Sequence, residues 1–95
     1  MPDLEERVVS WDRESAQRFG EYVRVHRRAA HLSQEALAYR AGITKNQVQL
    51  IEAGRGSARE LGPISNPRMK TLFGLSDALE VTLADILRAI EAPQE

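Results

Sequence analysis

The stretch that decides the fold runs from Ser33 to Gly54 and reads SQEALAYRAGITKNQVQLIEAG. It contains two short helical patterns, and Gly42 lies between them where a left-handed residue commonly ends a helix. Only three residues, Gly42 to Thr44, separate the two patterns. A connection this short cannot fully reverse the chain, so we expect the two helices to cross steeply.

Both helices of this stretch carry their own start signals. Ser33 is a good N-cap for the first helix, and Glu35 places a negative charge in its first turn. Thr44 caps the second helix, and Thr44 with Gln47 has the T-x-x-Q form of a capping box. Gly54 comes directly after the last periodic residue. The sequence therefore predicts both the beginning and the end of each helix.

A helix-turn-helix requires particular residue types at fixed positions in such a stretch. Ala38 supplies the small residue where the helices cross, and Gly42 supplies the turn four residues later. Val48 and Ile51, spaced three apart, anchor the second helix to the core. The rest of that helix is polar and available to a groove. Because all these conditions hold together, the sequence predicts a helix-turn-helix.

The remaining chain predicts three more helices. A stripe with a 3.6-residue period predicts a helix from about Ser10–Glu14 to Ala30, and Arg27 interrupts that stripe, so it requires a partner. Asn66 as N-cap and Pro67 as first residue predict a helix ending near Leu79. Thr82 opens the last one. The expected buried residues are Ala16, Phe19, Gly20, Val23 and Ala30 in the first helix; Met69, Leu72, Phe73, Leu75, Ser76 and Leu79 in the fourth, with Gly74 exposed; and Leu83, Ile86, Leu87 and Ile90 in the fifth.

These patterns predict an all-α protein, a compact five-helix bundle in one domain of 95 residues. We expect a flexible N-terminal arm over 1–12, a helix-turn-helix domain over 13–91 and a C-terminal tail over 92–95. A long loop, 55–66, would join the third and fourth helices.

The composition excludes several kinds of site. The chain has no cysteine, which rules out disulfides and thiolate chemistry and fits a reducing compartment. No apolar run is long enough to span a bilayer, and MPDLEERVV lacks the apolar core of a signal peptide. His26 and His31 lack metal-ligand spacing, and no nucleophile–base set or phosphate loop occurs. We expect a cytoplasmic protein that is not an enzyme and needs no metal or cofactor.

The charges are unevenly distributed although the net charge is −1. Residues 15–70 carry ten basic and four acidic side chains, whereas both ends of the chain are acidic. The local potential steers a ligand more than the total charge does. A basic middle segment therefore favours a polyanionic partner, although chance clustering on a solvated surface would look the same.

The segment LSQEALAYRAGITKNQVQLIEAG, followed by NPRMKTLFGLSDALEVTLADIL, resembles the Xre/Cro/phage-repressor helix-turn-helix family. The resemblance covers about Phe19 to Leu87 and implies a lambda-repressor-like domain. In size and layout the chain is similar to short repressors and restriction–modification controller proteins. It implies a bacterial or phage regulator that binds double-stranded DNA as a homodimer on a palindromic operator.

The resemblance also implies roles for individual residues. Base edges would be contacted from the exposed side of the third helix by Lys45, Asn46, Gln47, Gln49 and Leu50. Phosphates would be contacted by Ser33, Gln34, Arg55, Arg59 and Arg68. Arg27 would pair with Glu52, which would explain the interrupted stripe. The dimer interface would use Leu83, Ile86, Leu87 and Ile90.

Several alternatives stay open at this point. Gln47 either reads a base or only completes the capping box, and Leu50 either packs on a thymine methyl or borders the core. The added GSARELGPI makes the loop longer than the family's usual one. It either lengthens the phosphate contact through Arg59, reaches a partner subunit or is a tolerated insertion. The apolar stripe of the last helix either serves the core alone or leaves a surface for a second copy. Trp11 either covers the core or joins that interface.

Two functions from different classes fit these features. The first is a sequence-specific transcriptional regulator. The second is a protein-interaction module of the same fold, such as an antitoxin that binds a toxin through the long loop or the acidic tail. The operator, the regulated genes and the direction of regulation are not encoded in these patterns.

Overall fold

The computed structural model describes residues 11–55 and 67–91. These residues form five α-helices and confirm the predicted all-α bundle: α1 (Arg13–Ala29), α2 (Gln34–Ala41), α3 (Lys45–Ala53), α4 (Met69–Leu79) and α5 (Leu83–Ile90). Residues 1–10, most of the predicted loop and the tail over 92–95 lie outside the described part, and Arg59 with them.

The helices begin where the local chemistry places their caps. Asp12, Ser33, Thr44 and Thr82 each accept a hydrogen bond from an amide in the first turn of α1, α2, α3 and α5, respectively. Gly42 and Gly54 end α2 and α3 in the left-handed conformation, with φ values of 75° and 71°. These caps confirm the predicted boundaries of α2 and α3 and the predicted start of α5.

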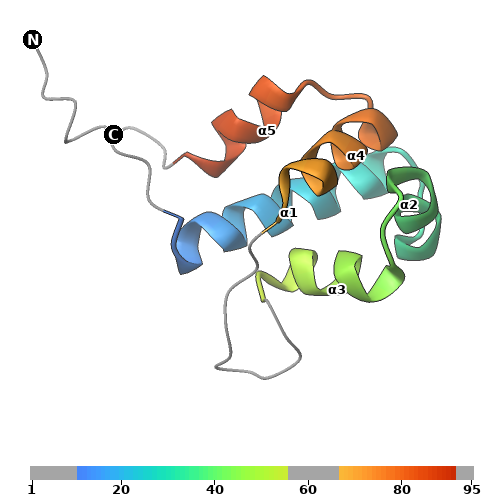
Figure 1. The fold of residues 1–95 in the computed structure, drawn as a ribbon, viewed down its shortest axis with the longest axis horizontal. Helices are drawn as coiled ribbons and strands as arrows, with labels where there is room; N and C mark the ends of the chain where they lie inside the picture. The colour runs from blue at the N-terminus through green and yellow to red at the C-terminus, as the bar shows by residue number, and fades with distance from the viewer. Residues whose placement is uncertain (1–10, 56–66, 92–95) are drawn as a thin grey trace, which may run out of the picture.

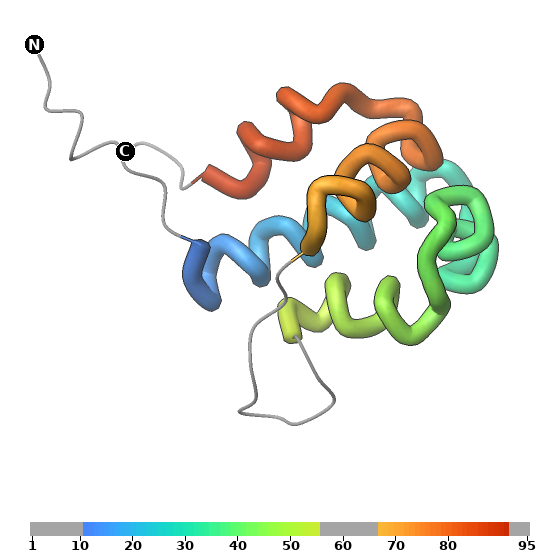
Figure 2. The backbone as a smooth tube through the Cα atoms, in the orientation of Figure 1, coloured from blue at the N-terminus to red at the C-terminus, as the bar shows by residue number. Residues whose placement is uncertain are grey.

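The long helix α1 lies between α3 and α5 (Figure 1). The helix α2 packs against both α3 and α4, and Figure 2 shows its short connection to α3 at the right edge of the molecule. One cluster of buried side chains joins all five helices: Phe19, Val23, Leu32, Leu37, Ala38, Ala41, Val48, Ile51, Leu75, Ala78, Leu79, Ile86 and Ile90. Trp11 packs edge-on against Phe19, with ring centroids 6.1 Å apart, so it covers the core at the start of α1.

Two glycines set the closest helix contacts. A Cβ atom on Gly20 of α1 would lie 2.2 Å from the carbonyl oxygen of Ile51, near the end of α3. A Cβ atom on Gly74 of α4 would lie 2.2 Å from the carbonyl oxygen of Ala41 in α2. The expectation that Gly74 is exposed and merely tolerated is therefore wrong, because this glycine lets α4 approach α2.

The start and the buried face of α4 also differ from the prediction. The helix begins at Met69 with Arg68 as its N-cap, so Pro67 is not its first residue. Met69 and Phe73 are each 59% exposed, whereas Thr71, Leu75, Ala78 and Leu79 are buried. The buried face of α4 is therefore rotated from the expected one. The reason is that Gly74 fixes which side of α4 lies against α2. In α1, Ala30 is the exposed C-cap instead of a core residue.

Candidate nucleic-acid interface

The helix α3 is held by its apolar side and exposes its polar side. Val48 is fully buried and Ile51 is nearly so, and both belong to the core cluster. Lys45, Asn46 and Gln49 are exposed, as sequence reasoning expected. The polar start of α3 is therefore accessible to a large partner.

Gln47 is exposed, but the N-terminal cap of α3 occupies one of its side-chain atoms. The backbone amide of Thr44 donates to Gln47 Oε1 over 2.9 Å, and the amide of Gln47 donates to Thr44 Oγ1 over 3.1 Å. The bidentate contact of an amide side chain with adenine needs both its oxygen and its nitrogen. In this arrangement Gln47 keeps only its amide nitrogen available as a donor.

Arg27 and Glu52 form the expected ion pair between α1 and α3. Arg27 Nε lies 2.6 Å from Glu52 Oε2, and Arg27 Nη1 donates to the carbonyl oxygen of Leu32 over 2.9 Å. The two charged side chains are only 11% and 4% exposed. The hydrogen bond with Glu52 raises the pKa of Arg27 above its ordinary value, so the guanidinium keeps its charge.

The same carboxylate holds Gln34 at the start of α2. Gln34 Nε2 donates to Glu52 Oε1 over 3.0 Å, so three helices meet at Glu52. The sequence assigned Gln34 to a DNA phosphate and missed this contact, because no local pattern relates residues 18 positions apart. The side-chain oxygen of the neighbouring Ser33 is likewise engaged, since it accepts from the amide of Ala36 over 3.0 Å.

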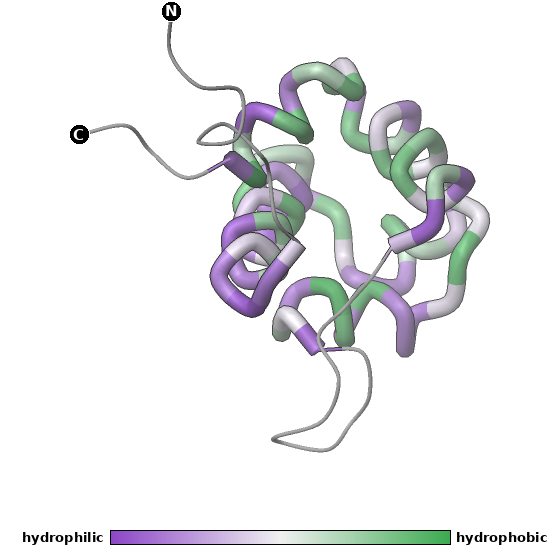
Figure 3. The backbone as a smooth tube through the Cα atoms, turned by 60° about the vertical axis from the view of Figure 1, so that its left-hand side comes forward, coloured by the Kyte–Doolittle hydropathy of each residue, from purple (hydrophilic) through white to green (hydrophobic). Residues whose placement is uncertain are grey.

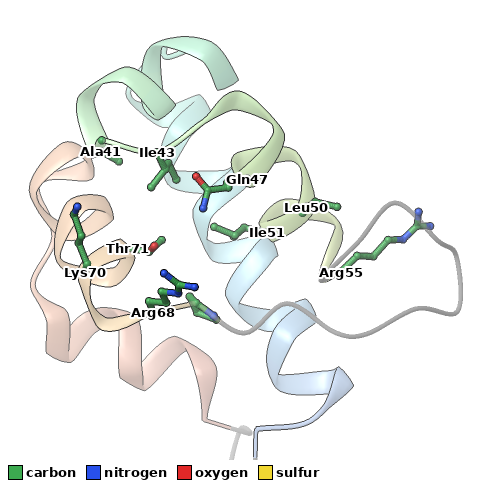
Figure 4. A pocket seen from close by; sticks show the side chains of 11 residues that line it. Ala41, Ile43, Gln47, Leu50, Ile51, Arg55, Arg68, Lys70 and Thr71 are labelled. Atoms are coloured by element: carbon green, nitrogen blue, oxygen red, sulfur yellow. The ribbon is translucent and has the colours of Figure 1, made fainter.

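Basic side chains lie on both sides of the polar face of α3. Arg55 follows the C-terminus of α3, and the exposed Arg68 and Lys70 lie at the start of α4. These residues line a pocket of about 410 Å³ between the α2–α3 connection, α3 and α4 (Figure 4). Sequence reasoning singled out Arg55 and Arg68 but missed Lys70, which could have been found as the second cation of the sequence PRMK.

Leu50 lines the same pocket and is half-buried. It therefore borders the core while one side stays accessible. This position is compatible with a contact to a thymine methyl as well as with a place at the border of the core.

The residues expected at a dimer interface divide into two groups. Ile86 and Ile90 are 1% and 5% exposed and belong to the core of the single chain, so they are not available to a partner. Leu83 is half-buried, and Leu87 is 49% exposed. Only these two leucines of the predicted set present surface on α5.

Figure 3 shows hydrophobic and hydrophilic residues mixed along each helix, without a long apolar segment. Accordingly, none of the described helices has the length and apolar character needed to cross a membrane. Within residues 11–55 and 67–91, no group of three or more histidine or acidic side chains is placed to hold a metal ion.

Comparison with known families identifies the same motif. Residues 18–62 match a family model described as a helix-turn-helix domain. Neither the curated proteins nor the solved structures gave a match to this chain. The match begins in α1 and includes α2 and α3, so the chain carries a helix-turn-helix domain.

Proposed function

We propose that this protein is a transcriptional regulator that binds a specific sequence of double-stranded DNA. The observation that carries the proposal is α3, which is anchored by Val48 and Ile51 and exposes Lys45 and Asn46. The family match to a helix-turn-helix domain supports it. A protein of this kind works in the cytoplasm, which the lack of cysteine suits.

The exposed residues divide into two roles in this proposal. Lys45 donates to guanine and Asn46 pairs with adenine in the major groove, where base edges differ between base pairs. Arg55 and Arg68 contact phosphates, which provide affinity and salt dependence but no sequence discrimination.

The proposal includes a homodimer on a palindromic operator. A single α3 of nine residues reads only a few base pairs, and two copies related by a two-fold axis read half-sites about 34 Å apart. The half-buried Leu83 and the exposed Leu87 of α5 are the candidates for the contact between copies.

Selection of bound sequences from a random DNA pool, repeated at several salt concentrations, tests this function. We expect a palindromic consensus and an affinity that falls as salt rises. Binding without sequence enrichment at any salt concentration would contradict a specific regulator.

Two variants test the division of roles on the selected site. Asn46→Ala should lose about 1–3 kcal/mol of discrimination between the selected site and a random one, because one base contact is removed. Arg68→Ala should weaken binding to both sites and reduce the salt dependence, because one phosphate contact is removed. The matched control is Arg88→Gln, which removes an exposed cation of α5, across α1 from α3. An equal loss on both DNAs for Asn46→Ala, or a loss confined to the selected site for Arg68→Ala, would refute the assignment.

A further inference from the structure

The pocket beside α3 has features that phosphate contacts alone do not explain. Its volume of about 410 Å³ lies within the range of small-molecule sites. One wall is the first turn of α4. The opposite wall is the part of α3 where its exposed side meets its buried side (Figure 4). A single DNA phosphate would fill only a small part of this space.

The α4 wall is suited to an anion. Arg68 and Lys70 are both cationic and line the pocket. The N-cap residue of α4, Arg68, makes no side-chain hydrogen bond to the first turn, so the amides there lack the cap that the other four helices have. Uncapped amides and the helix dipole favour a negative group at this end.

Thr71 provides an independent indication of a ligand. This residue is 9% exposed, and its side chain makes no hydrogen bond within residues 11–55 and 67–91. Its hydroxyl points into the pocket, toward Arg68 (Figure 4). Leaving a buried polar group without a partner costs free energy, and a bound acceptor would remove that cost.

Apart from Gln47 and Arg55, the rest of the lining is apolar. Ile43 from the α2–α3 connection and Ile51 from α3 face this space (Figure 4), and Leu50, Ala41 and Pro67 complete the apolar part of its lining. An inorganic ion would leave this apolar surface in contact with water. An organic molecule with an apolar body and one anionic group would cover it and gain the free energy of burial.

We propose that this pocket binds a small organic anion, whose charged group contacts Thr71, Arg68 and Lys70 and whose apolar body contacts Ile43 and Leu50. Such a ligand also lies against Gln47, whose amide nitrogen is directed toward the pocket in Figure 4. On the basis of the proposed function, the occupied pocket interferes with DNA at α3, so the ligand releases the operator.

Binding is tested first without DNA, by titrating the ¹⁵N-labelled protein with phenyl phosphate and following its amide signals. Inorganic phosphate is the probe that lacks the apolar body, and benzyl alcohol is the probe that lacks the charge. We expect saturable shifts at Gln47, Leu50 and Thr71 with phenyl phosphate, and at least about tenfold weaker binding of either partial probe, because each loses one class of contact.

Two variants and a control make the test specific. Thr71→Val keeps the shape of the side chain and removes the hydroxyl, and it should weaken phenyl phosphate binding about tenfold, because a charge-assisted hydrogen bond is lost. Arg68→Gln changes an exposed residue and should weaken binding without affecting folding. Arg88→Gln, on α5, should bind phenyl phosphate like the unaltered protein.

The possible failures are distinguishable. No saturable shifts, or shifts unchanged in Thr71→Val and Arg68→Gln, would refute the ligand site whether or not the protein binds DNA. Equal affinity for inorganic and phenyl phosphate would show a site for simple phosphate groups and would also refute it. Failure of the random-pool selection would refute the DNA function and leave the titration unaffected. Where both succeed, phenyl phosphate should compete with the selected DNA, and lack of competition would refute the regulatory role.

Discussion

Gly20 determines how closely α1 and α3 approach, and its lack of a side chain is essential to the fold. The carbonyl oxygen of Ile51 occupies the place where a Cβ atom would lie. Gly20→Ala gains about 1 kcal/mol in helix propensity, but the clash at 2.2 Å is with backbone and forces the helices apart, at the upper end of the cost of overpacking, about 3 kcal/mol. We expect lower stability in urea unfolding. Stability equal to or above that of the unaltered protein would contradict the close contact.

The matched control for Gly20 is Gly42, which also lacks a side chain but for another reason. No atom lies within 4 Å of an added Cβ there, and the residue has φ +75°. Gly42→Ala should therefore lose about 1–2 kcal/mol from backbone strain alone. Its helices should keep their packing.

These glycines also show what sequence reasoning can and cannot predict about a residue. Gly42 and Gly54 were predictable because helix ends have local signals in the chain. Gly74 was not, because its role depends on the Ala41 carbonyl oxygen, which belongs to another helix. Periodicity describes one helix at a time and contains no information on the distance between two.

At the scale of helices, the ion pair of Arg27 and Glu52 connects α1 to α3. Removing only Arg27 leaves a buried carboxylate without its cation, which costs about 3–5 kcal/mol. We expect Arg27→Met to lower the free energy of unfolding by about that amount, measured by urea denaturation. Gln34 alone cannot compensate the charge of Glu52.

The double variant Arg27→Met, Glu52→Leu separates the cost of an unpaired charge from the value of the pair. Replacing both partners with apolar side chains of similar size restores most of the lost stability, because no buried charge remains. A double variant as unstable as Arg27→Met would show that packing at this site, and not the charge, determines the loss.

The cap of α5 predicts a pH dependence. Asp85 accepts from the amide of Thr82 over 3.2 Å and pairs with Arg88. Its hydrogen bonds with Thr82 and then with Arg88 hold the pKa of this carboxyl below its ordinary value of 3.8. Because the folded-state pKa is depressed, the stabilisation is complete well above pH 3.8 and is lost as the pH falls through the folded value.

Asp85→Asn tests this dependence. The variant should melt at a lower temperature than the unaltered protein at neutral pH, and the difference should shrink as the pH falls below about 4. Thermal unfolding followed by circular dichroism over this pH range measures both effects. A difference that stays constant with pH would show that the carboxylate charge has no part in the cap.

At the scale of the whole molecule, the sequence predicted the exposed side of α3 but not the pocket beside it. Capping residues and periodicity lie within one short segment, so Lys45 and Asn46 could be placed from the sequence alone. The pocket combines the α2–α3 connection and α3 with the start of α4, which are far apart in the chain. Thr71 gave no signal in the sequence, because its burial and its lack of a partner arise only from this packing.

The proposed dimer would use the surface that α5 keeps after the core is filled. Ile86 and Ile90 point into their own chain, whereas Leu87 is 49% exposed and Leu83 half-buried beside it. A charged side chain at position 87 can stay in water in a single molecule but would be buried without a partner between two copies, at a cost of several kcal/mol.

Leu87→Glu should therefore shift the protein toward monomers in sedimentation velocity while its melting temperature stays close to the original. Tyr39→Glu, at an exposed position of α2, is the control and should leave the oligomeric state unchanged. If two copies bind a palindrome together, as proposed, Leu87→Glu should also weaken binding to the full operator more than to an isolated half-site. A dimer of unchanged affinity would place the contact between copies elsewhere than α5.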